Sequence, residues 1–589
     1  MLALEAEAKL RRPKACPART TGCFGRLGHP GNWPTRGFPR RCQVRREAGA
    51  GGVFQQLLTP VAGNLALSFL AASAPILVVL LLLGALRRPA WQAALAGLVA
   101  ALAIAMGVWR MPAGLAAASV TNGAVFALWP VMWIVVNALL LYNIAVRSGR
   151  FDALRDWIIT HMPNDRRVVL IVVGFCFGAL LEGVAGFGTS VAITSSLVIM
   201  MGFPALEALV FMLIFDTSPV AFGALGVPVT VLGAVTGLPA PALAAMIGRQ
   251  LPFMAIILPF YVIGLYGGWR SIRALWPMLL VAGGTFAAGQ FVASNYLDYT
   301  LTDVIASMLS LAATLLFLRF WQPPRDEAQA MAVVAPGASA NVPAWQGWLP
   351  WLIISATVIA WTIFKVAKIG EQAVHWPGLD NAISITLYNN KPYAAVWAFQ
   401  PLATGTAILL AALITAALVG LSPRALLGCI ARTWMQAWKP IVTVMLIVAV
   451  AYLMNYSGMA YTLGKGVASS GALFVLLSPF LGWFAVMLSG SDTSGNALFG
   501  NLQVVAARQL HLNPLLFAAA NSSGGVMGKM ISPQNISTGV AVTDLAGQEG
   551  QVFARTFIHS IVLTLILGGL IAVQQYLAPW MIPVIAAAH

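Results

Sequence analysis

Two polar stretches interrupt otherwise apolar sequence and set how this chain must fold. The first reads Glu182-Gly-Val-Ala-Gly-Phe-Gly-Thr-Ser190, and the second reads Ser489-Gly-Ser-Asp-Thr-Ser-Gly-Asn496. A further polar break follows each of them, at residues 215–228 and 521–535. Backbone rich in glycine and hydroxyl residues is tolerated inside a membrane only where it is buried in protein or lines a cavity. We therefore expect broken helices around an internal site.

The breaks recur at a nearly constant offset, which indicates an internal duplication. Pro228 lies 305 residues before Pro533, and Gly183 lies 307 residues before Gly490. Asp216-Thr-Ser also lies 305 residues before Asn521-Ser-Ser. The Lys/Arg bias of the loops places residues 147–167 in the cytoplasm and residues 367–400 outside, so the halves enter the membrane oppositely. Inverted repeats with broken helices are typical of secondary transporters.

The composition predicts an all-α polytopic membrane protein. Charged residues make up 9% of the 589 residues, against about 25% in soluble domains, and the mean hydropathy is +0.83. Long apolar runs predict about 12–14 transmembrane helices, including broken or re-entrant ones. The predicted parts are a first transmembrane half at 53–320, a cytoplasmic linker at 321–346 and a second transmembrane half at 347–589.

Residues 1–52 differ from the rest of the chain. They hold eleven Lys/Arg and three Glu, which is half of the net charge of +16. They are rich in Pro, Gly and Arg and have no apolar core of a signal peptide, so a basic disordered tail is expected. The predicted topology would leave these cations on the disfavoured outer side. This favours translation starting near Val53 over a tail that binds nucleic acid.

Ionisable side chains next to the breaks are the candidates for function, because charge inside a membrane is costly. Glu182, Asp216 and Asp492 are candidates for carrying a proton, since apolar surroundings disfavour an ionised carboxylate. Lys529 and Arg249 are candidates for pairing with a substrate carboxylate. Broken helices also expose N–H groups that bind anions. The rest of the expected substrate site is Ser522, Ser523, Gly524, Gly525, Thr189, Thr217, Ser491 and Asn496.

Other classes of protein fit the sequence less well. The chain has no P-loop, zinc-protease helix or nucleophile elbow, so neither an enzyme nor a metal or cofactor is expected. His511 and His559 are expected at interfaces or in loops, with a proton-relay role as the alternative. A channel needs no protonatable switch and no duplicated substrate motif, so a carrier is favoured.

At these motifs the sequence resembles the lactate permease family of bacterial carriers, from about Val53 to the C-terminus. Ser190 stands where the family's first motif has Pro, and Phe215 where it has a small polar residue. The strings that carry the resemblance are Glu182 to Thr189, Pro219-Val-Ala-Phe-Gly-Ala, Gly248-Arg-Gln-Leu-Pro252, Ser489 to Asn501 and Ala520-Asn-Ser-Ser-Gly-Gly-Val-Met-Gly-Lys-Met-Ile-Ser-Pro533.

The resemblance implies import of L-lactate, with D-lactate and glycolate, by proton symport across the bacterial inner membrane. We expect Lys529 and Arg249, with the backbone of residues 522–525, to hold the anion, and Glu182 or Asp492 to carry the proton. The expected partners are a small monocarboxylate, the proton and the lipid bilayer. A carrier for a dicarboxylate or sulfonate, sodium coupling and an anion channel stay open as alternatives, and the oligomeric state is not specified.

Overall fold

The computed structural model describes residues 53–584, except residues 85, 87, 161, 185, 187, 325, 327–328, 330–341, 541–542, 544 and 546–547. The basic segment 1–52 and most of the predicted linker 321–346 therefore lie outside the described residues. Residues 53–589 form one unit, and the predicted halves pack against each other within it.

Helices dominate the first half, as its apolar runs predict. π-helical turns at Ala127–Met132 and Leu170–Phe177 join some of them. The helices are α1 Leu65–Gly84, α2 Ala90–Gly107, α3 Ala113–Phe126, α4 Trp133–Arg147, α5 Arg150–Thr160, α6 Arg166–Val169, α7 Gly178–Val184, α8 Thr189–Met200, α9 Ala205–Phe215, α10 Gly223–Thr236, α11 Ala240–Ile247, α12 Leu251–Tyr296 and α13 Thr302–Phe320.

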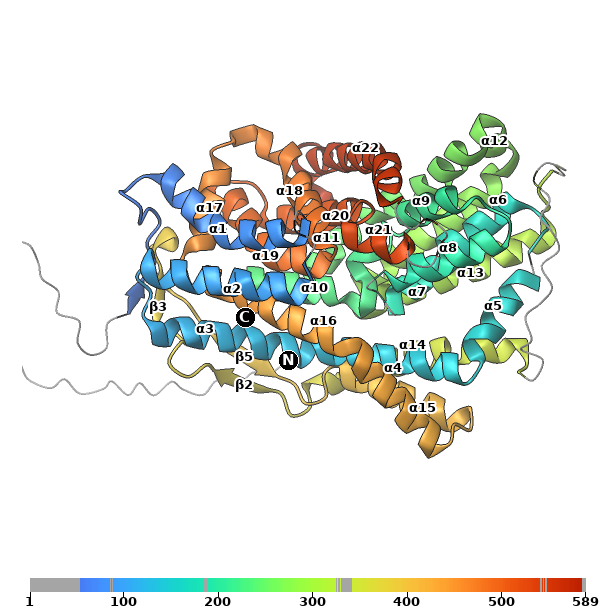
Figure 1. Ribbon diagram of the computed structural model, residues 1–589, viewed down its shortest axis with the longest axis horizontal. Coiled ribbons are helices and arrows are strands. Elements are labelled where there is room, and N and C mark those ends of the chain that lie inside the picture. The colour runs from blue at the N-terminus through green and yellow to red at the C-terminus, as the bar shows by residue number, and fades with distance from the viewer. Residues whose placement is uncertain are drawn as a thin grey trace, which may run out of the picture. The chain divides into compact units, whose positions relative to one another are not determined.

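The second half is also helical. It holds α14 Leu349–Ile363, α15 Thr404–Leu418, α16 Pro423–Ser457, α17 Met459–Ala468, α18 Phe474–Ser489, α19 Asp492–Gln509, α20 Pro514–Lys529, α21 Pro533–Val540 and α22 Glu549–Tyr576. Figure 1 shows α1, α2 and α3 in blue running side by side, with the orange α16 of the second half beside them. The two halves are therefore interleaved.

Short strands lie between α14 and α15, in the segment predicted to face outside. β2 (Gln372–His375) pairs antiparallel with β5 (Val396–Phe399), and β3 (Ile383–Ile385) pairs antiparallel with β4 (Lys391–Pro392). β1 (Phe54–Gln55) pairs parallel with β3, which joins the start of the described chain to its middle.

The described helices confirm an all-α polytopic membrane fold. Ten of them are long and apolar enough to cross a membrane, and the pair α9 and α10, bent by 63°, makes an eleventh span. The longest, Ala240–Tyr296, has 57 residues and breaks at Gly268. At 1.5 Å per residue it is about 85 Å long, enough for two crossings. The described residues thus hold ten or eleven candidate spans, and the apolar helices Ser190–Met200 and Thr404–Leu418, in the range of 10–17 residues, are too short to be counted among them.

The two halves repeat one order of helices and breaks. In the first half, α7, α8, α9 and α10 are separated by breaks at 185–188 and 216–219; in the second, α18, α19, α20 and α21 are separated by breaks at 490–491 and 530–532. The second pair of breaks is shorter than the sequence predicts. Residues 492–496 already belong to α19, because the Ser491 hydroxyl accepts the Ser494 N–H at 3.4 Å and caps the helix. Residues 521–528 lie inside α20.

Candidate functional site

The breaks of both halves meet at one small cavity of about 30 Å³. Glu182, Gly186, Val220, Gly223, Ala224 and Pro228 line it from the first half, and Gly490, Ser491, Asp492, Thr493 and Lys529 line it from the second. The sequence predicts that motifs about 300 residues apart form one site. All eleven lining residues lie in the polar stretches that the sequence singles out. Four of them, Glu182, Ser491, Asp492 and Lys529, are predicted site residues, although the role of each stays a prediction.

The backbone around this cavity is unusual. Ala224 and Leu225 have φ values of +46° and +58°, a left-handed region that costs non-glycine residues of order 1–3 kcal/mol each. The same region at Gly188 and Gly490, with φ of +80° and +71°, is open to glycine without strain. Strained backbone of this kind is concentrated at ligand-binding sites and switch regions.

A buried ionic cluster connects the halves beside the cavity. The Nζ atom of Lys529 lies 2.6 Å from Oε1 of Glu182 and 3.1 Å from Oδ2 of Asp216. Lys529 is 4% exposed, and both acids are also buried. Lys529 ends α20, whereas Glu182 lies on α7 and Asp216 follows α9. The ion pairs thus join the last turn of α20 to the two broken helices of the first half.

The Ser190 hydroxyl lies between the two carboxyl groups. Its Oγ atom is 2.7 Å from Oε2 of Glu182 and 2.9 Å from Oδ1 of Asp216. A hydroxyl carries one hydrogen and can donate it to one acceptor at a time. Both contacts are hydrogen bonds only when one carboxyl group supplies a second hydrogen. When this extra hydrogen is present, the charges of Lys529, Glu182 and Asp216 add up to zero. When it is absent, the three side chains together carry one net negative charge.

Asp303 is a further buried acid that the sequence does not single out. It is 1% exposed, and neither of its carboxyl oxygens has a hydrogen-bond partner among the described residues. A Cβ added to Gly183 would lie 2.6 Å from its Cβ, so it packs directly against the Glu182 segment. A buried carboxyl without hydrogen-bond donors is costly in apolar surroundings, so Asp303 joins the acids next to the breaks as a candidate for function. Asp303 lies in the first turn of α13, where acidic side chains are favoured by the helix dipole. The sequence therefore gives no reason to single it out.

A polar network fixes Asp492 on the other side of the cavity. Its Oδ2 atom accepts hydrogen bonds from Ser522 at 2.6 Å and from Asn496 at 3.0 Å. Asn521 donates to Oδ1 of Asn496 at 2.9 Å and accepts from Gln503 at 2.9 Å. Asp492 Oδ1 has no hydrogen-bond partner within the described part of the chain. The network positions one carboxyl oxygen, while the other packs against Gly525.

The remaining predicted residues are not among the residues that line the cavity. The Thr217 hydroxyl donates to the backbone of Ile214, and the Ser523 hydroxyl donates to Gln250 at 2.7 Å. Gly524 packs against the backbone of Pro479, and Gly525 packs against Asp492. α8 begins at Thr189, whose side chain is outside the described part.

Arg249 is not next to Lys529. Its Nε donates to Asn295 at 2.9 Å, and its Nη1 donates to the Met581 carbonyl at 2.8 Å. It does not line the small cavity. In this arrangement the guanidinium joins α12 to the segment after α22, and Lys529 is the cation at the cavity.

Neither His511 nor His559 lines the cavity. No metal centre is found in the residues that the structure describes. The Nδ1 atom of His559 lies 2.7 Å from the Tyr261 hydroxyl, between α22 and α12. His511 follows α19 with a φ of +54°. Within the described ranges, no three His, Cys, Asp or Glu side chains are arranged to hold a metal ion.

A larger cavity of about 790 Å³ lies beside the segment that holds β3–β5. α10 and α19 line both cavities and run side by side, since Gly500 packs against Leu232. At 1.5 Å per residue, about 24 Å of helix separates Asp492 from Arg508. The charged side chains among the described residues that line this cavity are Arg508 and Lys391. Two helices thus run from a cavity lined by two cationic side chains to the buried ionic cluster.

Membrane-spanning helices that break around a buried polar site are an architecture typical of transporters. The chain belongs to the L-lactate permease family, whose family description matches residues 68–578. It is accordingly a multi-pass protein of the bacterial inner membrane.

Several L-lactate and glycolate permeases are similar to this chain over nearly their whole length. The L-lactate permease of Escherichia coli (strain K12) is 42% identical over 551 residues, which cover 90% of this chain and 100% of that protein. The glycolate permease GlcA of the same strain is 39% identical over 549 residues, covering 88% and 98%. The L-lactate permease of Bacillus subtilis (strain 168) is 39% identical over 563 residues, covering 90% and 99%.

Proposed function

We propose that the protein imports L-lactate, and with it D-lactate and glycolate, together with protons. Relatives named for L-lactate and for glycolate support a small 2-hydroxy acid as substrate. The observation that carries the proposal is the contact of Lys529 with Glu182 at 2.6 Å and with Asp216 at 3.1 Å. One buried cation held by two carboxyl groups can exchange one of them for a substrate carboxylate.

In this mechanism the substrate carboxylate replaces Glu182 at the Lys529 ammonium. The cavity of about 30 Å³ has room for about one water molecule. Binding therefore requires Lys529 and Glu182 to separate and the broken segments to move apart. The exposed N–H groups at the start of α19 add a positive dipole end beside the anion.

Proton coupling follows from the charge of the cluster. An arriving monocarboxylate adds one negative charge to a site that already holds two carboxyl groups and one ammonium. Uncompensated charge in a low dielectric is costly, so the displaced Glu182 takes up a proton, with Ser190 linking it to Asp216. Loading with anion and proton together keeps the charge of the cluster constant, which makes symport the favoured cycle.

Asp492 supplies the preference for a 2-hydroxy acid. Its Oδ2 is already bonded to Ser522 and Asn496, while Oδ1 is free to accept the 2-hydroxyl of the substrate. A site that accepts a hydrogen bond from a hydroxyl discriminates strongly against the analogue that lacks it, because its own polar group is then unpaired. Propionate, which lacks the hydroxyl, is therefore expected to compete poorly with lactate.

The decisive experiment measures uptake of labelled L-lactate by proteoliposomes under imposed ion gradients. An inward proton gradient should drive accumulation, and reversing the gradient should drive efflux. Accumulation that follows a sodium gradient and ignores the proton gradient would refute the coupling. Saturable uptake separates a carrier from a channel, and competition by a panel of dicarboxylates and sulfonates separates the substrate classes.

A further inference from the structure

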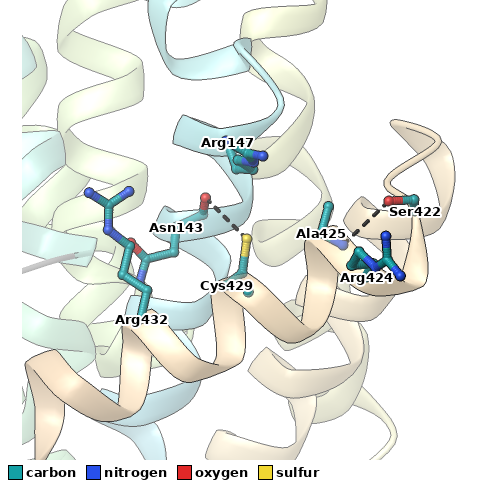
Figure 2. Close-up of a pocket in the computed structure, with 8 residues that line it drawn as sticks. Asn143, Arg147, Ser422, Arg424, Ala425, Cys429 and Arg432 are labelled. Carbon is teal, nitrogen blue, oxygen red and sulfur yellow. Dashed lines mark hydrogen bonds between the residues drawn. The ribbon is translucent and has the colours of Figure 1, made fainter.

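Three arginines surround a hollow of about 320 Å³ between α4 and α16, away from the transport site. The hollow is lined by Arg147, Arg424 and Arg432 together with Asn143, Ser422, Ala425, Gly428 and Cys429. Figure 2 shows Arg147 on α4 facing the turn of α16 that carries Cys429, with Arg424 and Arg432 on either side. No acidic residue is among the described lining residues.

The arginine charges are not neutralised by the protein. Within the described ranges, no salt bridge joins these guanidinium groups to an acid, whereas Arg155 and Arg167 both have acidic partners. Arg424 also lies in the first turn of α16, a 35-residue helix capped by Ser422. The positive end of the helix dipole therefore adds to the three formal charges. The hollow is built to receive an anion with several acceptor oxygens.

The same helix presents an exposed apolar surface next to the arginines. Trp434 and Met435 are 62% and 67% exposed. With Trp438, Ile441 and Val442 they line a second, apolar hollow of about 570 Å³. Met435 and Val442 follow Arg424 by 11 and 18 residues, spacings that return to the same face of an α-helix. Cationic and apolar surfaces are thus continuous along α16.

We infer that this surface binds an anionic phospholipid, with the phosphate among Arg147, Arg424 and Arg432 and an acyl chain along Met435 to Val442. Arginine pairs with phosphate oxygens in bidentate geometry, and basic hollows between membrane helices suit anionic headgroups. Tryptophan beside the arginines is typical of residues at the membrane interface. A soluble anion would use the arginines but not the apolar hollow. The inference does not depend on the transported substrate.

Native mass spectrometry of the purified full-length protein, titrated with phosphatidylglycerol or with phosphatidylcholine of the same acyl chains, tests the inference. The wild type should bind phosphatidylglycerol at least tenfold more tightly than it binds phosphatidylcholine. The variant R147Q/R424Q/R432Q should lose about 100-fold in affinity for it, since each arginine near a lipid surface contributes about 1 kcal/mol. R147Q alone, which leaves both α16 arginines in place, should lose about fivefold.

The matched control is R270Q/R273Q/R319Q, which removes three exposed arginines elsewhere. It should keep the preference for phosphatidylglycerol over phosphatidylcholine. A triple variant of the α4–α16 site that keeps the preference would overturn the inference. Inorganic phosphate that displaces the lipid at equal concentration would assign the site to a soluble anion instead. Lipid-independent dimers of the wild type that the α4–α16 variant fails to form would assign the surface to a second copy of the chain.

Discussion

Lys529, Glu182 and Asp216 form a cluster that protein stability alone does not explain. A buried ion pair contributes little net stability, because the desolvation of two charges offsets their attraction. Removing one partner is costly, however, because a charge is then left buried and unpaired. An arrangement of this kind is suited to exchange of one partner for another, which a carrier needs in each transport cycle.

The Glu182→Gln variant tests whether this carboxyl group carries the coupled proton. Gln keeps the size and the hydrogen-bonding ability of a protonated Glu but cannot release a proton. We expect proton-driven accumulation of lactate to fall by roughly 100-fold or more, because a side chain that cannot take up and release a proton cannot couple the proton gradient to lactate. Lactate–lactate exchange, which needs no net proton movement, should persist. Both are measured with labelled lactate in proteoliposomes.

Glu207→Gln is the matched control, because Glu207 is a partly exposed acid on α9 that does not line the cavity. It should change neither accumulation nor exchange. Loss of exchange and accumulation together in Glu182→Gln would contradict a pure coupling role and would indicate that the ionised Glu182 positions Lys529.

Gly525→Ala tests the position of Asp492 without changing any polar group. An added Cβ would collide with Oδ1 of Asp492 and would lie 2.7 Å from Cγ2 of Val486. We expect lactate uptake to fall on the order of 100-fold, the effect of a displacement of about 1 Å at a reacting or binding group. Gly569→Ala on α22 is the control, since its added Cβ meets open space. Equal uptake by the two variants would show that Asp492 does not need this position.

The sequence predicts the ingredients of the site but not their pairing. Glu182, Asp216 and Lys529 stand out because charges are rare inside apolar spans. That Lys529 pairs with both acids depends on how α20 packs against the first half, 347 residues away in sequence. Ser190 is visible in sequence only as a departure from the family motif, and its bridge between two carboxyl groups depends on tertiary geometry. Asp303 cannot be singled out from the sequence, because no local sequence pattern shows whether an acid in the first turn of a helix is buried.

At the scale of elements, sequence reasoning finds the breaks but overestimates their length. Glycine and serine suggest irregular backbone at 489–496 and 521–535, yet most of these residues are helical. Close packing of neighbouring helices explains why these stretches are rich in glycine. A Cβ at Gly482, Gly524 or Gly528 would collide with the backbone of the neighbouring helix, so these glycines allow α18 and α20 to approach closely.

The strand-containing segment predicted to face outside has its own pH dependence. Asp380 accepts hydrogen bonds from the Ala395 N–H at 2.8 Å and from His375 and Asn381. The Ala395 hydrogen bond, followed by that of His375, lowers the pKa of Asp380 below its usual value. A lowered folded-state pKa means that this contribution to stability is complete above the unfolded pKa, about 3.9, and is lost as the pH falls through the folded-state value.

Asp380→Asn should therefore loosen the pairing of β2 with β5 at pH 7. Hydrogen exchange of the Ala395 amide, followed by mass spectrometry, should be faster by roughly tenfold, because the Asn carbonyl accepts this hydrogen bond without the negative charge that strengthens it. The ratio between variant and wild type should shrink at a pH below the folded-state pKa. Glu371→Gln, an exposed acid of the same segment, should leave the exchange rate unchanged. A ratio independent of pH would contradict the role of the ionised carboxylate.

At the scale of the whole molecule, α10 and α19 run from the cavity of about 790 Å³ to the ionic cluster. Arg508 lines this cavity, and its guanidinium lies 5.2 Å from the centre of the Tyr388 ring. A cavity lined by one sign of charge raises the local concentration of the opposite ion. The cavity is therefore expected to gather carboxylate anions before they reach Lys529.

Arg508→Gln tests this gathering of anions. The KM for lactate should rise by up to about tenfold at low ionic strength, while the maximal rate changes little, because the steering of an anion precedes the transport step. The difference from wild type should diminish as salt is added. Arg555→Gln, on the exposed face of α22, is the control. A lower maximal rate with an unchanged KM would place Arg508 in the conformational cycle instead.

The parallel pairing of β1 with β3 has a consequence for biogenesis. Phe54 pairs with Ile383, and Gln56 donates to the carbonyls of Asn455 and Tyr456. The partners of the first described strand are thus made about 330 to 400 residues after it. At about 5–20 residues per second, the ribosome needs roughly 15 to 80 s to reach them. The earliest segment of the unit therefore lacks these partners until most of the bundle has been synthesised.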